Sequence, residues 1–247
     1  MIRTFSLLTW LLLLLLSCQS DIEWFGSEEG QVNPIQIEDK TTSSSYVAPE
    51  SIDQQESKEE KGTTELILES SVTIFTKNQR NTLLGQGSGA FIEKDKIVTN
   101  YHVIESGVYY EVVFNSDDNV KYEATLHKID KAHDVAILKI DTLFPEKVLK
   151  INKEYPKIGD DIIVAGSPMG LNGTVSKGNI SAIRKFPPDD YDLFQISAPI
   201  SPGSSGGPVV NLNAELIAIS VSGVKSEGAQ NLNFAVPAKY ISFLLGD

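Results

Sequence analysis

The sequence predicts an all-β fold built from two six-stranded antiparallel barrels, and three observations support this prediction. Short runs rich in β-branched and aromatic residues recur from residue 65 onward, and clusters of turn-forming residues separate them. Six such runs lie before a break near residues 141–156, and six lie after it. Only two short helices interrupt the pattern, whereas a fold of alternating strands and helices needs a helix after nearly every strand.

The first barrel is expected to cover about residues 64–145 and the second about residues 155–247. The strands expected in the first barrel are 66–75, 89–92, 96–99, 109–114, 122–129 and 135–140. Those expected in the second barrel are 161–165, 174–183, 193–198, 209–211, 216–221 and 233–236. The two expected helices are a short one after Tyr101 and a terminal one at residues 237–245.

The first 17 residues have the features of a secretory signal peptide. A basic residue, Arg3, precedes a leucine-rich run that is too short to span a membrane comfortably. Cys18 follows, and since it is the only cysteine of the chain, an intrachain disulfide is excluded. Residues 15–18 (LLSC) resemble the lipobox of bacterial lipoproteins, which implies cleavage before Cys18 and attachment of a diacylglycerol to its sulfur. The alternative is an incidental cysteine at the end of a discarded signal.

Residues 18–63 are expected to form a lipidated cysteine followed by a disordered acidic tether. Between residues 19 and 62, eleven acidic residues stand against three lysines, which gives −8 of the −12 net charge of the whole chain. A segment this polar buries too little apolar surface to offset the entropy of ordering it. Because the acidity is concentrated here and no basic stripe follows, the sequence argues against nucleic-acid binding.

Three short motifs carry candidate catalytic residues. Ser205 lies in residues 203–207 (GSSGG), where the missing Cβ atoms of glycine allow a sharp turn close to a substrate. His102 directly follows an apolar strand, and Asp134 opens another, where a charge entering a buried strand needs a partner. Taken singly, these motifs are also compatible with a plain turn, a structural histidine and a strand-end cap.

The order of these residues along the chain discriminates between folds. A serine hydroxyl is a weak nucleophile until an imidazole removes its proton and a carboxylate holds that imidazole in the right tautomer. In α/β-hydrolases the acid and the histidine follow the serine, but here all histidines precede Ser205 and a strand-like run follows it. A subtilisin-type fold needs long helices that the pattern lacks. The order His102, Asp134, Ser205 is that of the chymotrypsin class, and His127 and His133 are expected at the surface.

The same motif supplies an oxyanion hole. In the chymotrypsin class its donors are the N–H of the nucleophile and the N–H two residues earlier, which are Ser205 and Gly203 here. Such fixed donors stabilise charge that develops only in the tetrahedral state. Glycine suits position 203 because a side chain would block the approaching carbonyl. Ser204 is the competing serine, and its glycine spacing fits neither role as well.

At these residues the chain resembles the HtrA/Deg branch of the trypsin-like serine proteases. The resemblance implies two six-stranded β-barrels, with His102 and Asp134 on the first, Ser205 on the second, and the site in the cleft between them. It covers about residues 85–237, in the order of the family. The matching stretches are GSGAF (87–91), IVTNYHV (97–103), D…DVAILKI (130–140), GSPMGL (166–171), TVSKGNISA (174–182), PGSSGGP (202–208) and NFAVP (233–237).

Two departures from the family pattern bear on substrate choice and regulation. Family members usually carry PDZ modules after the protease, whereas this sequence stops at Asp247, so we expect a protease domain without PDZ modules. Ser197 stands where the family commonly has an acidic residue. Ile200, five residues before the nucleophile, resembles the position of the primary specificity pocket and favours small or medium aliphatic residues. Ser220 and Ser222 are further substrate-binding candidates.

The sequence therefore predicts a serine endopeptidase that hydrolyses polypeptides, unfolded ones included, through an acyl-enzyme in envelope protein quality control or processing. The alternative is a catalytically dormant protease fold that acts as a binding protein, and a third reading is a purely structural envelope lipoprotein. No cofactor and no metal are expected. The predicted location is the periplasmic face of a membrane or the cell surface, with a lipid anchor, and the resemblance implies a homotrimer.

Overall fold

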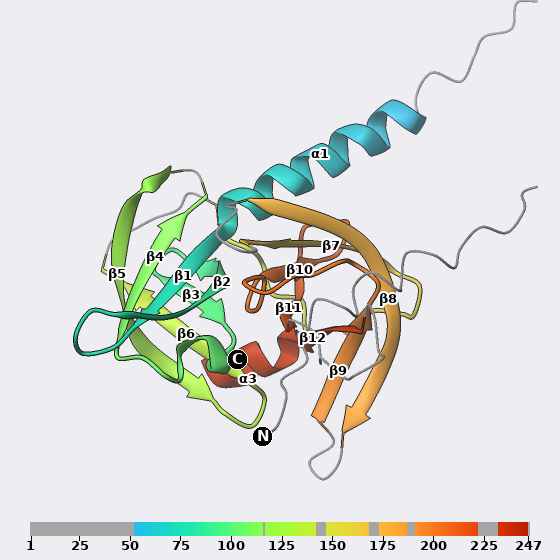
Figure 1. The fold of residues 1–247 in the computed structure, drawn as a ribbon. Coiled ribbons are helices and arrows are strands. Elements are labelled where there is room, and N and C mark those ends of the chain that lie inside the picture. Colours follow the sequence, from blue (N-terminus) through green and yellow to red (C-terminus); the bar gives the residue numbers. More distant parts are fainter. Residues whose placement is uncertain are drawn as a thin grey trace, which may run out of the picture. The chain divides into compact units, whose positions relative to one another are not determined.

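The computed structural model describes residues 52–115, 117–141, 147–167, 173–186, 191–221 and 232–246. The predicted signal peptide, Cys18, most of the predicted tether and Ser222 lie outside these ranges. The described residues form two closed antiparallel β-barrels and three helices (Figure 1). The predicted all-β fold of two six-stranded barrels is therefore confirmed.

The first barrel closes in the strand order β1-β2-β3-β6-β5-β4. Its strands are β1 (Ser71–Lys77), β2 (Leu83–Glu93), β3 (Lys96–Thr99), β4 (Tyr109–Phe114), β5 (Asp117–Asp130) and β6 (Val135–Ile140). Because side chains alternate between the two faces of a strand, Ala136 and Leu138 of β6 point into the barrel core together with Val72 and Ile74 of β1. Closure pairs every strand on both sides and leaves no free edge.

The second barrel closes in the order β10-β11-β12-β9-β8-β7. Its strands are β7 (Asp161–Gly166), β8 (Thr174–Phe186), β9 (Tyr191–Ile196), β10 (Pro208–Val210), β11 (Leu216–Val221) and β12 (Asn233–Pro237). Ile162 and Val164 of β7 pack inside it against Ile180 of β8 and Phe194 of β9. Each barrel thus has a hydrophobic core of its own.

A third hydrophobic core joins the two barrels. Val135 and Ile137, on the outer face of β6, pack in one cluster with Ile163 and Val210 of the second barrel. This explains why strands such as β6 read as continuous apolar runs, since both of their faces are buried. Residues at the ends of these shared-core strands are therefore held at a fixed separation across the barrel interface.

The predicted end of the tether at about residue 63 and the predicted start of the first strand at residue 66 are wrong. Helix α1 (Ile52–Ser70) occupies this segment, and β1 begins only at Ser71. In the part of α1 with described side chains, Thr63, Ile67 and Ser70 are buried, and their spacing of four and three residues places them on one helical face. The run Leu-Ile-Leu at 66–68 has a β-like composition, but so short a run does not distinguish a strand from a buried helix. Packing of this face against the barrels stabilises the helical conformation over a strand.

The two predicted helices are present as α2 (Tyr101–Ile104) and α3 (Ala238–Leu245). Helix α3 ends at Gly246, whose φ of 96° lies in the left-handed region that glycine adopts at no steric cost. Its Ile241 is part of the shared core, and Lys128 of β5 donates to its last two carbonyls at 3.0 Å each. Among the described helices, none has the length and apolar character that crossing a membrane requires.

Candidate active site

The imidazole of His102 and the carboxylate of Asp134 form a hydrogen-bonded pair. His102 lies in α2, and Asp134 immediately precedes β6. His102 Nδ1 is 2.8 Å from Asp134 Oδ2, and the backbone N–H of His102 donates to Asp134 Oδ1 at 2.9 Å. Both carboxylate oxygens therefore hold the same residue, which fixes the direction of the ring. With Nδ1 committed to Asp134, Nε2 is left to exchange a proton with another group.

The backbone of Asp134 is strained and firmly held. Its φ is 55°, a left-handed conformation that residues other than glycine rarely adopt. Its carbonyl accepts hydrogen bonds from the backbone N–H of Tyr101 and from Nδ2 of Asn100, each at 3.1 Å. Strain of this kind persists only where the surroundings enforce it, and it clusters at functional sites.

The environment of His102 raises its pKa. The largest cause is the hydrogen bond to Asp134, which favours the protonated ring. Partial burial lowers the pKa, but the negative charges of Asp134 and Glu105 raise it again, so the net shift is upward. The pair thus stabilises an imidazolium, which is the form that a general base takes once it has accepted a proton.

Glycines give the Ser205 loop its shape. Gly203 and Gly206 have φ values of 98° and 85°, which lie in the left-handed region that favours glycine. A Cβ at Gly206 would come within 2.2 Å of the Ser88 carbonyl oxygen and 2.3 Å of Thr99 Oγ1. The loop is therefore packed backbone to backbone against the first barrel, at a distance that no side chain would allow.

This packing brings Ser205 up to the part of the first barrel that carries His102. The backbone N–H of Ser88, in β2, donates to the Ser205 carbonyl at 2.7 Å. A Cβ added at Gly87 would lie 2.6 Å from Val103, the neighbour of His102, and 3.1 Å from the Ser205 carbonyl oxygen. Segments that lie about one hundred residues apart in the sequence thus meet at one point of the barrel interface.

The other predicted substrate-binding residues have different positions. Ile200 is half-buried and packs against the core of the second barrel. Ser220 is fully buried; its N–H donates to the Gly207 carbonyl and its own carbonyl accepts from Gly206 N–H, both at 2.8 Å. Ser220 therefore lies behind the Ser205 loop, and its contacts support the loop. Ser222 lies outside the described residues.

Of the two histidines expected at the surface, only His127 is exposed. The expectation for His133 is wrong: it is half-buried, with Nδ1 2.6 Å from Asp130 Oδ2. Its ring stacks on Tyr240 of α3 at 3.9 Å between centroids, with 15° between the planes. The expectation assumed the alternation of a strand, but residues 131–134 form a turn, so the alternation does not apply.

Sequence reasoning missed the residues that hold the site in place. Ser88 and Asn100 are both fully buried and bond to the Ser205 loop and to Asp134, respectively. Both lie within stretches recognised as family motifs, GSGAF and IVTNYHV. That membership was the only available signal, because a buried serine or asparagine has no distinctive sequence pattern of its own.

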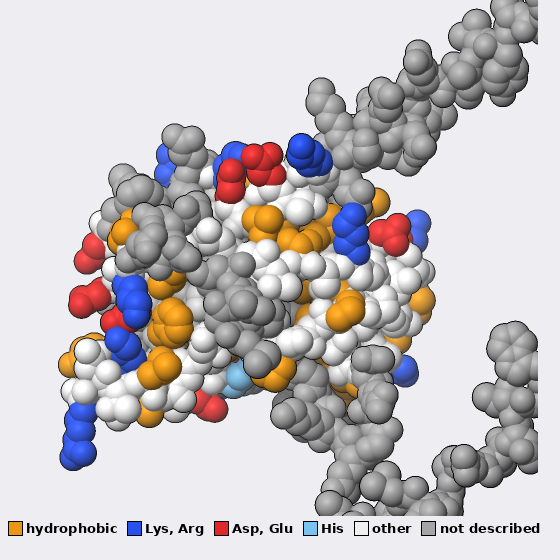
Figure 2. Space-filling model, turned by 45° about the horizontal axis from the view of Figure 1, so that its top comes forward, with side chains coloured by type: hydrophobic (Ala, Val, Ile, Leu, Met, Phe, Trp, Pro, Cys, Tyr) orange, Lys and Arg blue, Asp and Glu red, His pale blue; other side chains and the backbone are white. Residues whose placement is uncertain are grey.

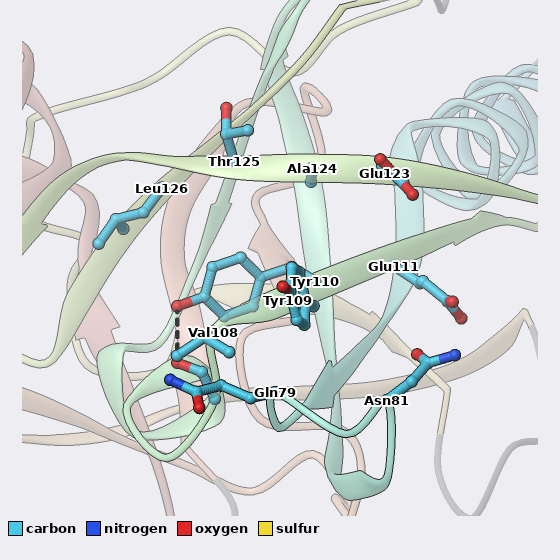
Figure 3. Close-up of a pocket in the computed structure, with 11 residues that line it drawn as sticks. Gln79, Asn81, Val108, Tyr109, Tyr110, Glu111, Glu123, Ala124, Thr125 and Leu126 are labelled. Atoms are coloured by element: carbon cyan, nitrogen blue, oxygen red, sulfur yellow. Dashed lines mark hydrogen bonds between the residues drawn. The ribbon is translucent and has the colours of Figure 1, made fainter.

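A separate groove of about 790 Å³ lies on the first barrel, lined by β4, β5 and the turn between β1 and β2 (Figure 3). Tyr110 crosses it, and its hydroxyl donates to the Gly107 carbonyl at 3.2 Å. As far as the structure describes the lining, it contains no predicted site residue. In Figure 2 acidic and basic side chains alternate around the edge of one face, and hydrophobic and uncharged side chains lie between them.

Two antiparallel β-barrels, a His–Asp pair on the first and a glycine-rich serine loop on the second define the class of the trypsin-like, chymotrypsin-fold peptidases. The chain belongs to the trypsin-like peptidase domain family, which matches residues 87–219. This range begins at the GSGAF motif and ends in β11, so it includes His102, Asp134 and Ser205.

The similar proteins lie in the branch that the sequence motifs indicate. A probable periplasmic serine endoprotease DegP-like of Rhizobium meliloti is 37% identical over 160 residues, which cover 62% of this chain and 31% of the relative. The periplasmic serine endoprotease DegP of Escherichia coli is 31% identical over 173 residues, or 67% of this chain and 36% of the relative. The chain spans about a third of the length of these relatives. The resemblance to the HtrA/Deg branch is confirmed.

Solved structures agree with this family. A serine endoprotease from Yersinia pestis superimposes with a TM-score of 0.65 at 29% identity, covering 75% of this chain and 65% of that one. A protease from M. tuberculosis in its active form superimposes with a TM-score of 0.66 at 27% identity, covering 74% of this chain and 82% of that one.

Proposed function

We propose that this chain is a serine endopeptidase that hydrolyses peptide bonds of polypeptides through an acyl-enzyme. One observation carries the proposal: a carboxylate holds the His102 ring through Nδ1, and the Ser205 loop is anchored to the same part of the first barrel. Nucleophilic catalysis by serine requires this arrangement of a hydroxyl, a base and a group that orients the base. Membership of the trypsin-like peptidase family supports it.

In the proposed mechanism, Ser205 Oγ attacks the carbonyl carbon of the scissile peptide while His102 Nε2 accepts the hydroxyl proton. Asp134 keeps the Nδ1 proton on the far side of the ring and stabilises the imidazolium. The N–H groups of Gly203 and Ser205 stabilise the oxyanion. His102 then gives its proton to the leaving amine, which leaves an acyl-enzyme. A water molecule, deprotonated by His102, then attacks the ester carbonyl. The acyl C–Oγ bond breaks, the product leaves as a carboxylic acid, and His102 returns the proton to Ser205 Oγ.

Specificity belongs to the same proposal. Ile200 would form an apolar wall of the primary pocket and favour small or medium aliphatic side chains, because burial of a methylene group stabilises by roughly 0.8 kcal/mol. Ser222 remains a substrate-binding candidate. For Ser220 we propose a supporting role instead, because both of its backbone groups are bonded to the loop.

We further propose that the protein is exported and anchored through a diacylglycerol on Cys18, with the protease facing the periplasm or the cell surface. Support comes from the sequence around Cys18 and from relatives that are named periplasmic serine endoproteases. A homotrimer and a role in envelope protein quality control or processing stay part of this proposal. Metabolic labelling with a fatty acid, compared between the native chain and Cys18→Ala, tests the anchor.

A fluorophosphonate probe tests the enzymatic proposal, because it modifies only a serine that a working base activates. We expect the purified protein to be labelled and the Ser205→Ala variant not to be. Ser204→Ala is the matched control, since it removes the competing serine of the same loop and is expected to keep the label. Absence of labelling in the native protein would favour the dormant protease fold. Cleavage of a peptide library by the native protein then reports the pocket preference.

A further inference from the structure

We propose that two buried serines, Ser88 from the first barrel and Ser220 from the second, are positioning residues of the oxyanion hole. The inference rests on the proposed function and deepens it. Residues 203–207 consist of three glycines and two serines, so the loop has few side chains with which to fix its own backbone. One bond lies within the loop, from the Gly207 N–H to the Ser204 carbonyl at 3.0 Å, and the side-chain bonds that direct its N–H groups come from outside it. The hydroxyl groups of Ser88 and Ser220 are in place to make these bonds.

Ser220 holds the peptide that carries the Ser205 N–H. Its hydroxyl is 2.7 Å from the Ser204 carbonyl oxygen and 3.2 Å from the Gly207 carbonyl oxygen. A hydroxyl has one proton to donate, and the shorter contact is with Ser204. In a trans peptide the C=O and the following N–H point in opposite directions. Fixing the Ser204 carbonyl from one side therefore aims the Ser205 N–H to the other side.

Ser88 holds the peptide between the two oxyanion donors. Its hydroxyl donates to the Gly203 carbonyl at 2.7 Å, and at the other end of that peptide the Ser204 N–H donates to the Ser201 carbonyl at 2.9 Å. The plane of the Gly203–Ser204 peptide is thus held at both ends. Gly203 could otherwise rotate freely, since glycine occupies positive and negative φ about equally well.

The direction of the Ser88 hydroxyl is itself determined by its surroundings. Ser88 Oγ accepts a hydrogen bond from the Ser167 N–H at 2.9 Å, so its single proton is left for the Gly203 carbonyl. Ser167 is held in turn by Thr73 Oγ1, 2.5 Å from its own hydroxyl, and by Gln86 Nε2, which donates to its carbonyl at 3.0 Å. Ser88 and Thr73 are fully buried and Ser167 is 1% exposed. The Ser88 hydroxyl is therefore shielded from water, and losing its partner leaves a buried group unsatisfied.

The inference predicts a defect that is confined to the transition state. In Ser88→Ala and Ser220→Ala the triad side chains remain, but the oxyanion donors lose their fixed direction. We expect kcat to fall about 10- to 100-fold with KM within about 3-fold of the native value, since losing one donor outright costs about 10²–10³ in kcat. The affinity of a peptide aldehyde, which forms a tetrahedral adduct, should fall in parallel. The midpoint of the pH profile should not move, because it reports His102.

A control separates positioning from general loss of stability. Ser71 is a buried serine whose hydroxyl donates to the Ile67 carbonyl at 2.5 Å, and its contact lies in the α1–β1 junction. Ser71→Ala should lower the melting temperature and leave kcat unchanged. If Ser88→Ala does not fold, Ser88→Cys is only slightly larger and has a weaker donor; a kcat below the native value then supports the inference, and a native kcat contradicts it.

The results of these experiments distinguish a failure of the positioning role from a failure of the proposed function. A native protein that neither cleaves peptides nor reacts with fluorophosphonate overturns both. An active native protein whose folded Ser88 and Ser220 variants keep the native kcat and aldehyde affinity overturns the inference alone. Equal losses in kcat for these variants and for Ser71→Ala also contradict it, because the effect would then follow stability.

Discussion

The first barrel holds its part of the site with side chains that belong to the site, whereas the second barrel presents a loop that other residues must hold. Asp134 contributes both carboxylate oxygens to His102, and such charge-assisted bonds are stronger than neutral ones. The Ser205 loop is fixed by hydroxyl groups from Ser88 and Ser220 and by close backbone packing. The half with the proposed acid–base pair is therefore fixed by charge, and the half with the proposed nucleophile is fixed by neutral hydrogen bonds and sterics.

Removing the proposed nucleophile should have the largest effect, because neither half can then contribute to catalysis. Ser205→Ala is expected to lower kcat by about 10⁶ without unfolding the protein, because the bond from Ser88 N–H to the Ser205 carbonyl does not use the side chain. The double variant Ser205→Ala/His102→Ala should lose little more, since an imidazole with no hydroxyl to activate contributes almost nothing. Peptide hydrolysis and thermal unfolding measure the two effects, and additive losses would show that the residues do not work as a unit.

Neutralising the carboxylate tests the first half by itself. Asp134→Asn keeps the shape of the side chain, but its amide can place a donor where His102 Nδ1 needs an acceptor. By analogy with the same change in a serine-protease triad, kcat should fall by about 10⁴. Loss of the hydrogen bond that is the largest cause of the raised pKa of His102 should also lower that pKa. Single-turnover kinetics and histidine NMR titration measure the two changes, and an unaltered kcat would remove Asp134 from its role.

This contrast also explains what the sequence could predict. The order of His102, Asp134 and Ser205 among apolar strands was readable, because a charged or glycine-flanked residue stands out beside β-branched runs. Both barrels and all twelve strands followed from the same pattern, although the first strand begins at Ser71, five residues later than expected. The supporting role of Ser88 and Ser220 was not readable: Ser88 lay in a motif without a role of its own, and Ser220 was expected to bind substrate. Their hydroxyl contacts cross 115 and 16 residues of sequence.

At two places the local sequence pattern gave a wrong prediction, because tertiary packing determines the structure there. The apolar residues 66–68 read as the start of a strand, but burial of Ile67 between the barrels selects a helix. Likewise, His133 was expected to face solvent, but its ring stacks on the Tyr240 ring, which keeps it half-buried. The core partners of Ile67 and the Tyr240 ring lie far away in the sequence, and no local period reports them. For His133 the local turn at residues 131–134 and the bond to Asp130 contribute as well.

An ion pair at the junction of β9 and α3 lies outside the candidate active site. Its removal tests the stability of the barrel framework without changing the catalytic groups. Asp192 of β9 is almost fully buried, and its carboxylate accepts hydrogen bonds from Lys239 at 2.6 Å and from the Tyr155 hydroxyl. Burial raises the pKa of Asp192, but the bonds from Lys239 and Tyr155 outweigh it and the net shift is downward. Lys239→Met leaves the buried carboxylate with the Tyr155 hydroxyl and with Lys185 at 3.8 Å. It should cost about 2–3 kcal/mol of unfolding free energy, less than a buried charge with no remaining partner.

Lys150→Met is the matched control for this ion pair. Lys150 contacts Glu215 at 3.1 Å, but its side chain is 81% exposed, and exposed pairs contribute about 0–1 kcal/mol. Urea unfolding of both variants measures the difference. The contribution of Asp192, whose folded pKa is lowered, is present above its unfolded pKa and is lost as the pH falls through the folded value. Comparable losses in the two variants would mean that burial does not strengthen the Lys239 pair.

The smallest expected effect is a pH dependence. As the pH rises, catalytic activity should increase, whereas the stability that the His102–Asp134 pair contributes should decrease. The pKa of His102 is raised above 6.5, so the protonated His102–Asp134 pair stabilises the fold fully below about pH 6.5, the unfolded value. That contribution is lost as the pH rises through the folded pKa. Catalysis needs the neutral ring, so kcat/KM should rise over the same interval in which this stability declines. Melting temperatures of the native protein and of His102→Ala, compared across pH 5–9, should converge toward high pH, whereas a difference that grows with pH would reverse the assigned direction of the shift.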